Sequence, residues 1–210
     1  MPARRTLVFV IGLLAPLTSF GQDDFATLKL SRGVQLQIPK GWWLLGKEIN
    51  HMIQTSSTVA LDLSGIGLPD GDKTNLLAAN SMPRTTYAAV RVNSTIPSPM
   101  SPSDIQAVTT AGLQDIGSEM RAGLERALKV QNNQILQFYE IRKDSISGHP
   151  AIVIEYLRSG QQGPVIVQYN GIYTNSQEIS VVLSYRESEA TLWRPVVARI
   201  RQSIILAQWP

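Results

Sequence analysis

The sequence has no cysteine and only two histidines, His51 and His149. The lack of cysteine excludes disulfides, thiol catalysis, cysteine-ligated metals and a lipid-modified N-terminal cysteine. A metal site would need both histidines and several carboxylates to converge from distant parts of the chain. The G-x-S-x-G elbow, phosphate-binding loops and dinucleotide fingerprints are also missing. We therefore expect no metal, no cofactor and no enzymatic activity.

Long hydrophobic runs are equally scarce, and the one near the N-terminus is short. Arg4 and Arg5 precede an apolar run over residues 7–17, which contains a proline. A basic pair before a short apolar run is typical of an export signal, and the run is too short to span a bilayer. Small residues follow, so we predict cleavage after Gly21, leaving residues 22–210 as a single periplasmic or secreted domain. The alternative is an uncleaved membrane anchor.

The net charge of the chain is small. The whole chain carries a formal net charge of +3, and the predicted leader holds two arginines and no acid. The exported chain would therefore carry a charge of about +1. Lysine and arginine are scattered and do not interleave with aromatic residues, so nucleic acid is not an expected partner.

The strongest local pattern covers residues 101–129, where apolar residues recur at helical spacing. Ser101 is a suitable N-cap, Pro102 fits the first helical position, and Asp104 can complete a capping box. The pattern predicts one long amphipathic helix. Because the flanking segments resemble strands, we expect this helix to lie across a sheet.

The remaining chain predicts mainly strands. The expected strands cover residues 34–38, 58–63, 87–92, 135–141, 151–157, 165–173 and 178–185, and residues 64–83 are expected to form a surface loop. The connections between the strands predicted after residue 134 are short, which indicates antiparallel hairpins. A second helix is expected to begin with Thr191 as its N-cap. The predicted class is α/β (α+β): a three-layer α/β/α sandwich around a mainly antiparallel sheet.

Two groups of side chains invite a functional interpretation. Three acids in and near the predicted loop suggest calcium, but their spacing does not fit an EF-hand, so a solvated turn is the preferred interpretation: Asp62, Asp70 and Asp72. Aromatic residues and one acid on or beside the predicted strands form the candidate partner or ligand surface: Trp43, Tyr139, Glu155, Tyr169 and Tyr173. Core packing is the alternative for the tyrosines.

Glu155 lies on the strand predicted to be central, where an unpaired carboxylate would be costly. We expect it to find a partner, and the candidate partners are arginines on predicted strands or close to their ends: Arg142, Arg158 and Arg186. A ligand-binding role is the alternative for this carboxylate.

The order of these elements resembles the PsbP-like, or DcrB-like, superfamily over about residues 27–205. The stretches that carry the resemblance are Ile38-Pro39-Lys40-Gly41-Trp42, the long helix, Gly148-His149-Pro150-Ala151, Leu183-Ser184-Tyr185-Arg186, and Trp193 with Ile200 to Ile204. The resemblance implies an α/β/α sandwich. It also implies a family used mostly for binding: extrinsic photosystem subunits, a Ran-binding import factor, envelope lipoproteins, and chaperones for type VI secretion effectors. These members share no common active site, so no functional residue is carried over.

The resemblance suggests two functions. The first is an exported, non-catalytic protein-binding domain of the bacterial cell envelope that acts as an accessory or scaffold subunit. The alternative is an immunity protein or chaperone for a secreted effector. The lipid-acceptor cysteine of the envelope lipoproteins is missing here, and the effector chaperones lack an export signal, so this sequence departs from both groups.

Overall fold

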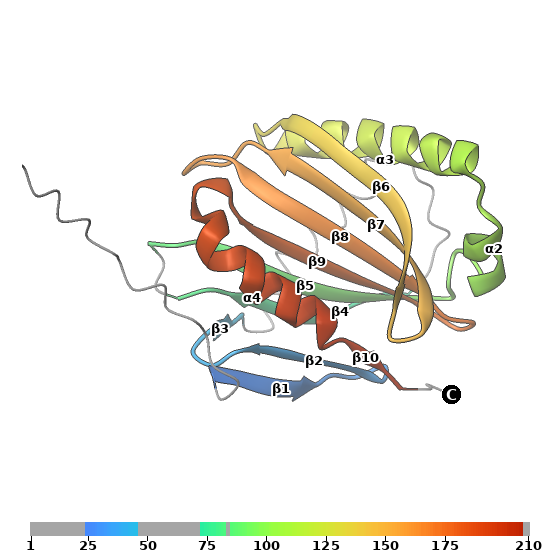
Figure 1. The fold of residues 1–210 in the computed structure, drawn as a ribbon, viewed down its shortest axis with the longest axis horizontal. Helices are drawn as coiled ribbons and strands as arrows, with labels where there is room; N and C mark the ends of the chain where they lie inside the picture. The colour runs from blue at the N-terminus through green and yellow to red at the C-terminus, as the bar shows by residue number, and fades with distance from the viewer. Residues whose placement is uncertain (1–23, 46–71, 83–84, 208–210) are drawn as a thin grey trace, which may run out of the picture.

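A computed structural model describes residues 24–45, 72–82 and 85–207 (Figure 1). The predicted leader, the predicted strand over residues 58–63, His51 and Asp62 lie outside the described residues.

A seven-stranded antiparallel sheet forms the centre of the structure, in the order β3-β4-β5-β9-β8-β7-β6. Its strands are β3 (Trp43–Leu44), β4 (Asp72–Asn80), β5 (Ala88–Ile96), β6 (Ile135–Ile146), β7 (His149–Arg158), β8 (Val165–Tyr173) and β9 (Glu178–Arg186). The last four follow one another as hairpins, as predicted. Strand β9 then pairs with β5, which comes much earlier in the chain.

The β6–β7 hairpin shows how local sequence sets the register. Ile146 lies opposite His149, so the connection has only two residues, Ser147 and Gly148. Both have positive φ, at 53° and 77°. Two positive φ values define the turn that matches the twist of paired strands, and glycine adopts this conformation without strain.

The predicted long helix is two helices, α2 (Pro102–Ala107) and α3 (Thr110–Val130). The start is confirmed: Ser101 and Asp104 form the capping box. The continuous helix is wrong, because Thr109 is an N-cap that accepts a hydrogen bond from the Gly112 amide at 3.1 Å. Apolar periodicity continues through the break, and a threonine cap is easily missed between two helical segments.

Strand β4 contradicts the predicted surface loop over residues 72–80, whereas residues 64–71 of that loop, Asp70 among them, lie outside the described residues. Its second half is buried, with Ala79 at 0% exposure, and the strand pairs with β5 through a bulge between Asn75 and Leu77. Alanine and asparagine have little strand propensity, so the neighbouring strand rather than the local sequence decides this conformation.

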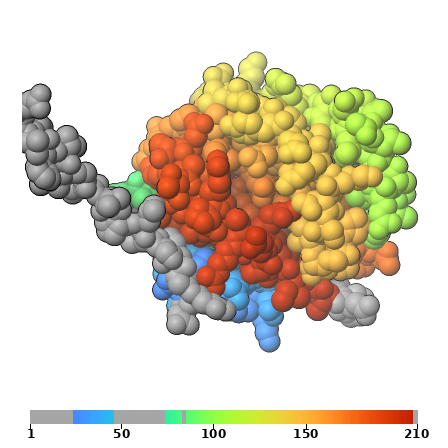
Figure 2. Space-filling view, viewed as in Figure 1, coloured from blue at the N-terminus to red at the C-terminus, as the bar shows by residue number. Residues whose placement is uncertain are grey.

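Helices α2 and α3 cover one face of the sheet, and α4 (Ala190–Gln202) covers the other (Figure 1). A small sheet lies beside α4 on that second face, formed by β1 (Phe25–Lys29), β2 (Val34–Pro39) and β10 (Ile205–Leu206). Figure 2 shows this side, with the red α4 between blue β1–β2 and yellow β6. Trp42 is buried, and its ring meets Trp193 of α4 edge-on at 5.8 Å.

The start of α4 differs from the prediction. A 3-10 turn (Glu187–Glu189) precedes it, and the N-cap is Glu189 rather than Thr191. Glu189 makes no capping bond and instead accepts hydrogen bonds from the Tyr87 amide at 2.8 Å and the Trp193 indole at 3.0 Å. These long-range bonds cannot be read from local sequence.

The predicted fold class is confirmed: the structure is an α+β sandwich around a mainly antiparallel sheet. No helix in the described residues is long and apolar enough to span a membrane.

Candidate functional site

The five residues of the predicted surface do not come together. Tyr169 and Tyr173 lie on the α3 face of the sheet, in or beside its buried cluster. Tyr139 is 41% exposed, and its electrostatic neighbours, Glu155 among them, place it on the α4 side. Trp43 lies on β3, at the other end of the strand order from β6. The five residues therefore do not form one surface. Only Tyr169 and Tyr173, which share the α3 face, remain candidates for a common site.

The predicted ion pair of Glu155 is wrong. Its carboxylate accepts a hydrogen bond from the Gln168 amide at 3.3 Å, and no ion pair to it occurs in the described part of the chain. Arg158 is three residues along β7, and because side chains alternate between faces, it lies on the opposite side of the sheet. Glu140, not an arginine, lies directly across from Glu155 on β6.

Tyr169 and Tyr173 gather around a buried carboxylate, Glu178. The Tyr169 hydroxyl donates to Glu178 Oε1 at 2.5 Å, and Tyr173 pairs with Glu178 in the β8–β9 register. A Cβ added at Gly171 would lie 3.0 Å from the Tyr169 ring and 3.2 Å from the Tyr173 hydroxyl. Glycine thus gives both rings room to lie against β8. Burial, together with the Glu178 carboxylate, raises the pKa of Tyr169 and of Tyr173 well above the ordinary value.

We expect at least three of the six tyrosines to stay protonated above pH 10 in the folded protein. Burial raises the pKa of Tyr156 to about 12, and those of Tyr169 and Tyr173 are also raised. A raised pKa means that folding favours the neutral hydroxyl. The stability that these hydroxyls contribute is therefore complete below pH 10 and is lost as pH rises through the raised pKa values. Phenolate absorbance measured against pH, in native buffer and in urea, tests this. Full ionisation near pH 10 with an unchanged circular dichroism spectrum would contradict it.

A groove runs along the α3 face beside the helix, with a cavity of about 140 Å³. Its apolar wall comes from α3, β7 and β8, and its more polar wall comes from β5 and β9. The lining residues are Met120, Leu124, Ile154, Tyr156, Val167, Tyr169, Ser180, Val182, Arg91 and Asn93. Strand register explains the arrangement, because Arg91, Val182, Tyr169 and Ile154 lie in one row across four neighbouring strands.

Arg91 brings a positive charge into this groove. Its guanidinium donates to the carbonyls of Ala79 at 2.8 Å and Val90 at 2.9 Å, and to Asn80 Oδ1 at 2.8 Å. No carboxylate pairs with it within the described residues. Burial lowers the pKa of Arg91, and Tyr87 partly opposes this effect. The groove thus combines an apolar wall with a desolvated cation on the more polar wall.

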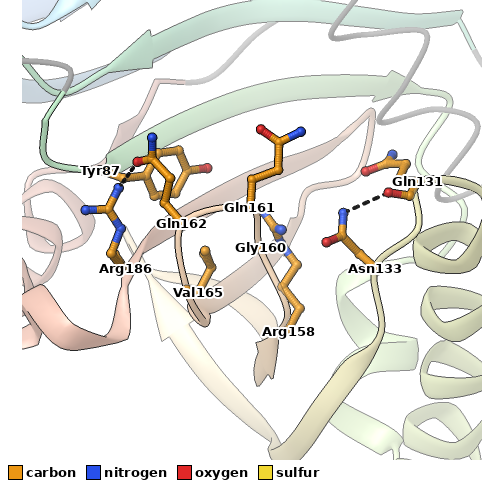
Figure 3. Close-up of a pocket in the computed structure, with 10 residues that line it drawn as sticks. Tyr87, Gln131, Asn133, Arg158, Gly160, Gln161, Gln162, Val165 and Arg186 are labelled. Carbon is orange, nitrogen blue, oxygen red and sulfur yellow. Dashed lines mark hydrogen bonds between the residues drawn. The ribbon is translucent and has the colours of Figure 1, made fainter.

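A second, polar cavity of about 310 Å³ lies at the end of the same sheet face (Figure 3). Arg158 of β7 and Arg186 of β9 both pair in register with Val165 of β8, so the two arginines flank this valine on one face. The β7–β8 loop forms another part of the wall. Arg186 is held by Glu189 and Gln162.

The sequence interpretation missed Glu178, Arg91 and the arginine pair beside Val165. The sequence suggests Arg158 and Arg186 only as partners of Glu155. The strand alternation contained a usable signal, because it separates Arg158 from Glu155. The pairing of β5 with β9, which brings Arg91 to the groove, had no local signal.

Histidines and acids do not form a metal-binding group of three or more anywhere in the described ranges. His149 is the first residue of β7, directly after the turn.

The fold and its layers define the class: this is a PsbP-like α+β fold. Among solved structures, the chain is similar to PsbP (CyanoP) from Synechocystis sp. PCC 6803, with a TM-score of 0.52 and 13% identity over 93% of this chain and 100% of that one. LpqN of Mycobacterium tuberculosis, described as involved in cell envelope biogenesis, gives a TM-score of 0.47 and 10% identity over 83% of each chain. PA94 of Pseudomonas aeruginosa, a protein of unknown function, gives 0.39 and 14% over 89% of this chain and 98% of that one.

No protein-family model matches the sequence, and no curated protein does. At these identities the structural similarity shows the fold alone.

Proposed function

We propose that this protein is an exported, non-catalytic binding subunit of the bacterial cell envelope, periplasmic or secreted, and that a protein partner docks in the α3-face groove. The partner segment is apolar and carries an acidic side chain. The observation that carries the proposal is the groove itself, which combines an apolar wall with the desolvated guanidinium of Arg91 on the more polar wall.

Charge complementarity supports the acidic side chain. A buried guanidinium satisfied only by carbonyl and amide oxygens keeps its full positive charge, and a carboxylate brought by a partner would form a charge-assisted pair with it. The half-buried apolar residues Leu124 and Val182 on opposite walls would pack against the rest of the segment.

Export is supported by the basic and apolar pattern of the first residues, and a binding role is supported by the family resemblance. In the alternative function, the partner is a secreted effector that this protein neutralises or escorts. Identification of the captured partner separates these two functions.

We expect Leu124→Arg to reduce partner capture from an envelope extract at least about tenfold, because the longer side chain would occupy the groove and because the partner would have to desolvate its charge in the apolar wall. The measurement is affinity capture by the full chain, with quantitative mass spectrometry of the retained proteins. Ser118→Arg places the same charge on the exposed side of the same helix and should capture as the wild type does.

Equal capture by Leu124→Arg and the wild type, with both proteins folded by circular dichroism, would show that the groove is not the docking site. Loss of capture in both variants would point to a general charge effect and would also contradict the proposal.

A further inference from the structure

The polar cavity beside the groove has a lining that suits a small ligand rather than a protein segment. The end of α3, the β7–β8 loop and the strand ends contribute this lining, and none of the described residues in it is acidic: Tyr87, Gln131, Asn133, Arg158, Gly160, Gln161, Gln162, Gly163, Val165 and Arg186. Its volume of about 310 Å³ is in the range of small-molecule sites.

Arg158 is the cation that this cavity leaves uncompensated. It is half-buried, and its Nη1 donates to the Ser159 carbonyl at 2.9 Å. Within the described part of the chain no carboxylate pairs with it. A guanidinium has several donors in a planar fork that matches carboxylate and phosphate oxygens. The remaining donors of Arg158 can therefore serve an oxyanion in the cavity.

Arg186 is held in place and supplies a second donor group. It pairs with Glu189, which leaves the local charge balanced there, and it also donates to Gln162 and to the Thr85 carbonyl. Its position is set by the sheet, since both arginines flank Val165, two strand spacings or roughly 10 Å apart at their Cα atoms. In Figure 3 their side chains lie on either side of this valine.

Carboxamides make up most of the remaining polar lining. Gln131, Asn133, Gln161 and Gln162 each carry an amide that both donates and accepts hydrogen bonds. Hydroxyl groups also donate and accept, so this lining complements a hydroxylated molecule better than a purely apolar one. The Asn133 amide is already ordered, because it donates to the Gln131 carbonyl and accepts from Ser159.

We propose that this cavity binds a carboxylate or phosphate group carried by a hydroxylated small molecule of monosaccharide size. Arg158 provides the main charge-assisted hydrogen bonds, Arg186 faces the anion from the other side of Val165, and the carboxamides bind the hydroxyls.

Isothermal titration of the full chain with D-glucuronate, glucose 6-phosphate and glucose tests this. We expect at least one anionic sugar to bind, and glucose to bind at least about tenfold more weakly, because it cannot form charge-assisted bonds. The two anions distinguish a carboxylate site from a phosphate site. In Arg158→Gln, anion binding should weaken about tenfold or more, and Arg158→Lys should retain part of it.

Arg121→Gln is the matched control, since Arg121 is an exposed arginine on α3 outside the cavity, and its affinity should equal that of the wild type. The proposal is overturned if neither anion binds at millimolar concentration, or if folded Arg158→Gln binds as tightly as the wild type. Inorganic phosphate binding as tightly as glucose 6-phosphate would overturn the role of the carboxamides. Because no partner protein is present, the result is independent of the capture experiment.

Discussion

Ile154→Ala is expected to lower the free energy of unfolding by about 2–5 kcal/mol. Ile154 is completely buried at 0% exposure on β7, between Ile141 of β6 and Tyr169 of β8 in the register. It belongs to the cluster beneath α2 and α3 that also contains Ile105 and Met120. Truncation removes buried methyl groups and leaves a cavity between paired strands that cannot collapse freely. Urea unfolding followed by circular dichroism measures the change.

The matched control is Ile205→Ala, the same substitution on β10 at a side chain that is 51% exposed. Its effect should be within about 0.5 kcal/mol, as for other surface changes. If the two variants lost equal stability, the assignment of Ile154 to the core of the α3 face would be wrong.

Arg201→Ala should cost about 2–3 kcal/mol, because Arg201 connects α4 to two strands of the main sheet. Its Nε donates to Asn170 Oδ1 at 2.9 Å and its Nη2 to Asp144 Oδ2 at 2.5 Å. Asn170 is fully buried, so its oxygen would lose a partner in a place that bulk water does not reach. Arg121→Ala, which breaks an exposed pair with Glu125, should cost little and is the control.

This network also predicts a dependence on pH. Burial alone would raise the pKa of Asp144, but the Ser145 amide and the Arg201 guanidinium outweigh it and lower the pKa below its ordinary value. A lowered carboxyl pKa contributes stability that is present above the unfolded value of 3.8 and is lost as pH falls through the folded value. The stability difference between wild type and Arg201→Ala should therefore shrink in acid. A constant difference across that range would contradict the pairing with Asp144.

Local patterns were sufficient for the elements that depend on local interactions. The strands from β6 to β9 follow alternation and turn residues, and the Ser101 capping box is formed as the spacing predicts. Strand β4 was missed because its residues do not favour a strand and only pairing with β5 makes it one. The break at Thr109 was missed because the apolar stripe runs across it.

The candidate site was harder to predict than the fold, since it depends on which strands become neighbours. Tyr169 and Tyr173 were singled out as aromatic residues on one strand. Their carboxylate partner, Glu178, could be inferred from the hairpin that joins β8 to β9. Arg91 could not, because it reaches the groove only through the pairing of β5 with β9.

The pairing of β5 with β9 also limits when β5 can find its partner strand. The four strands β6 to β9 form a meander whose contacts join neighbours in the chain. Thr95 of β5, in contrast, can pair with Glu178 only after the chain has been synthesised as far as β9. Contacts that close long loops form slowly, and strands that wait for a distant partner expose hydrogen-bonding edges meanwhile. Strands β4 and β5 therefore depend for their place on β9, the last strand of the meander, and this segment is the one most in need of protection from aggregation while the chain is incomplete.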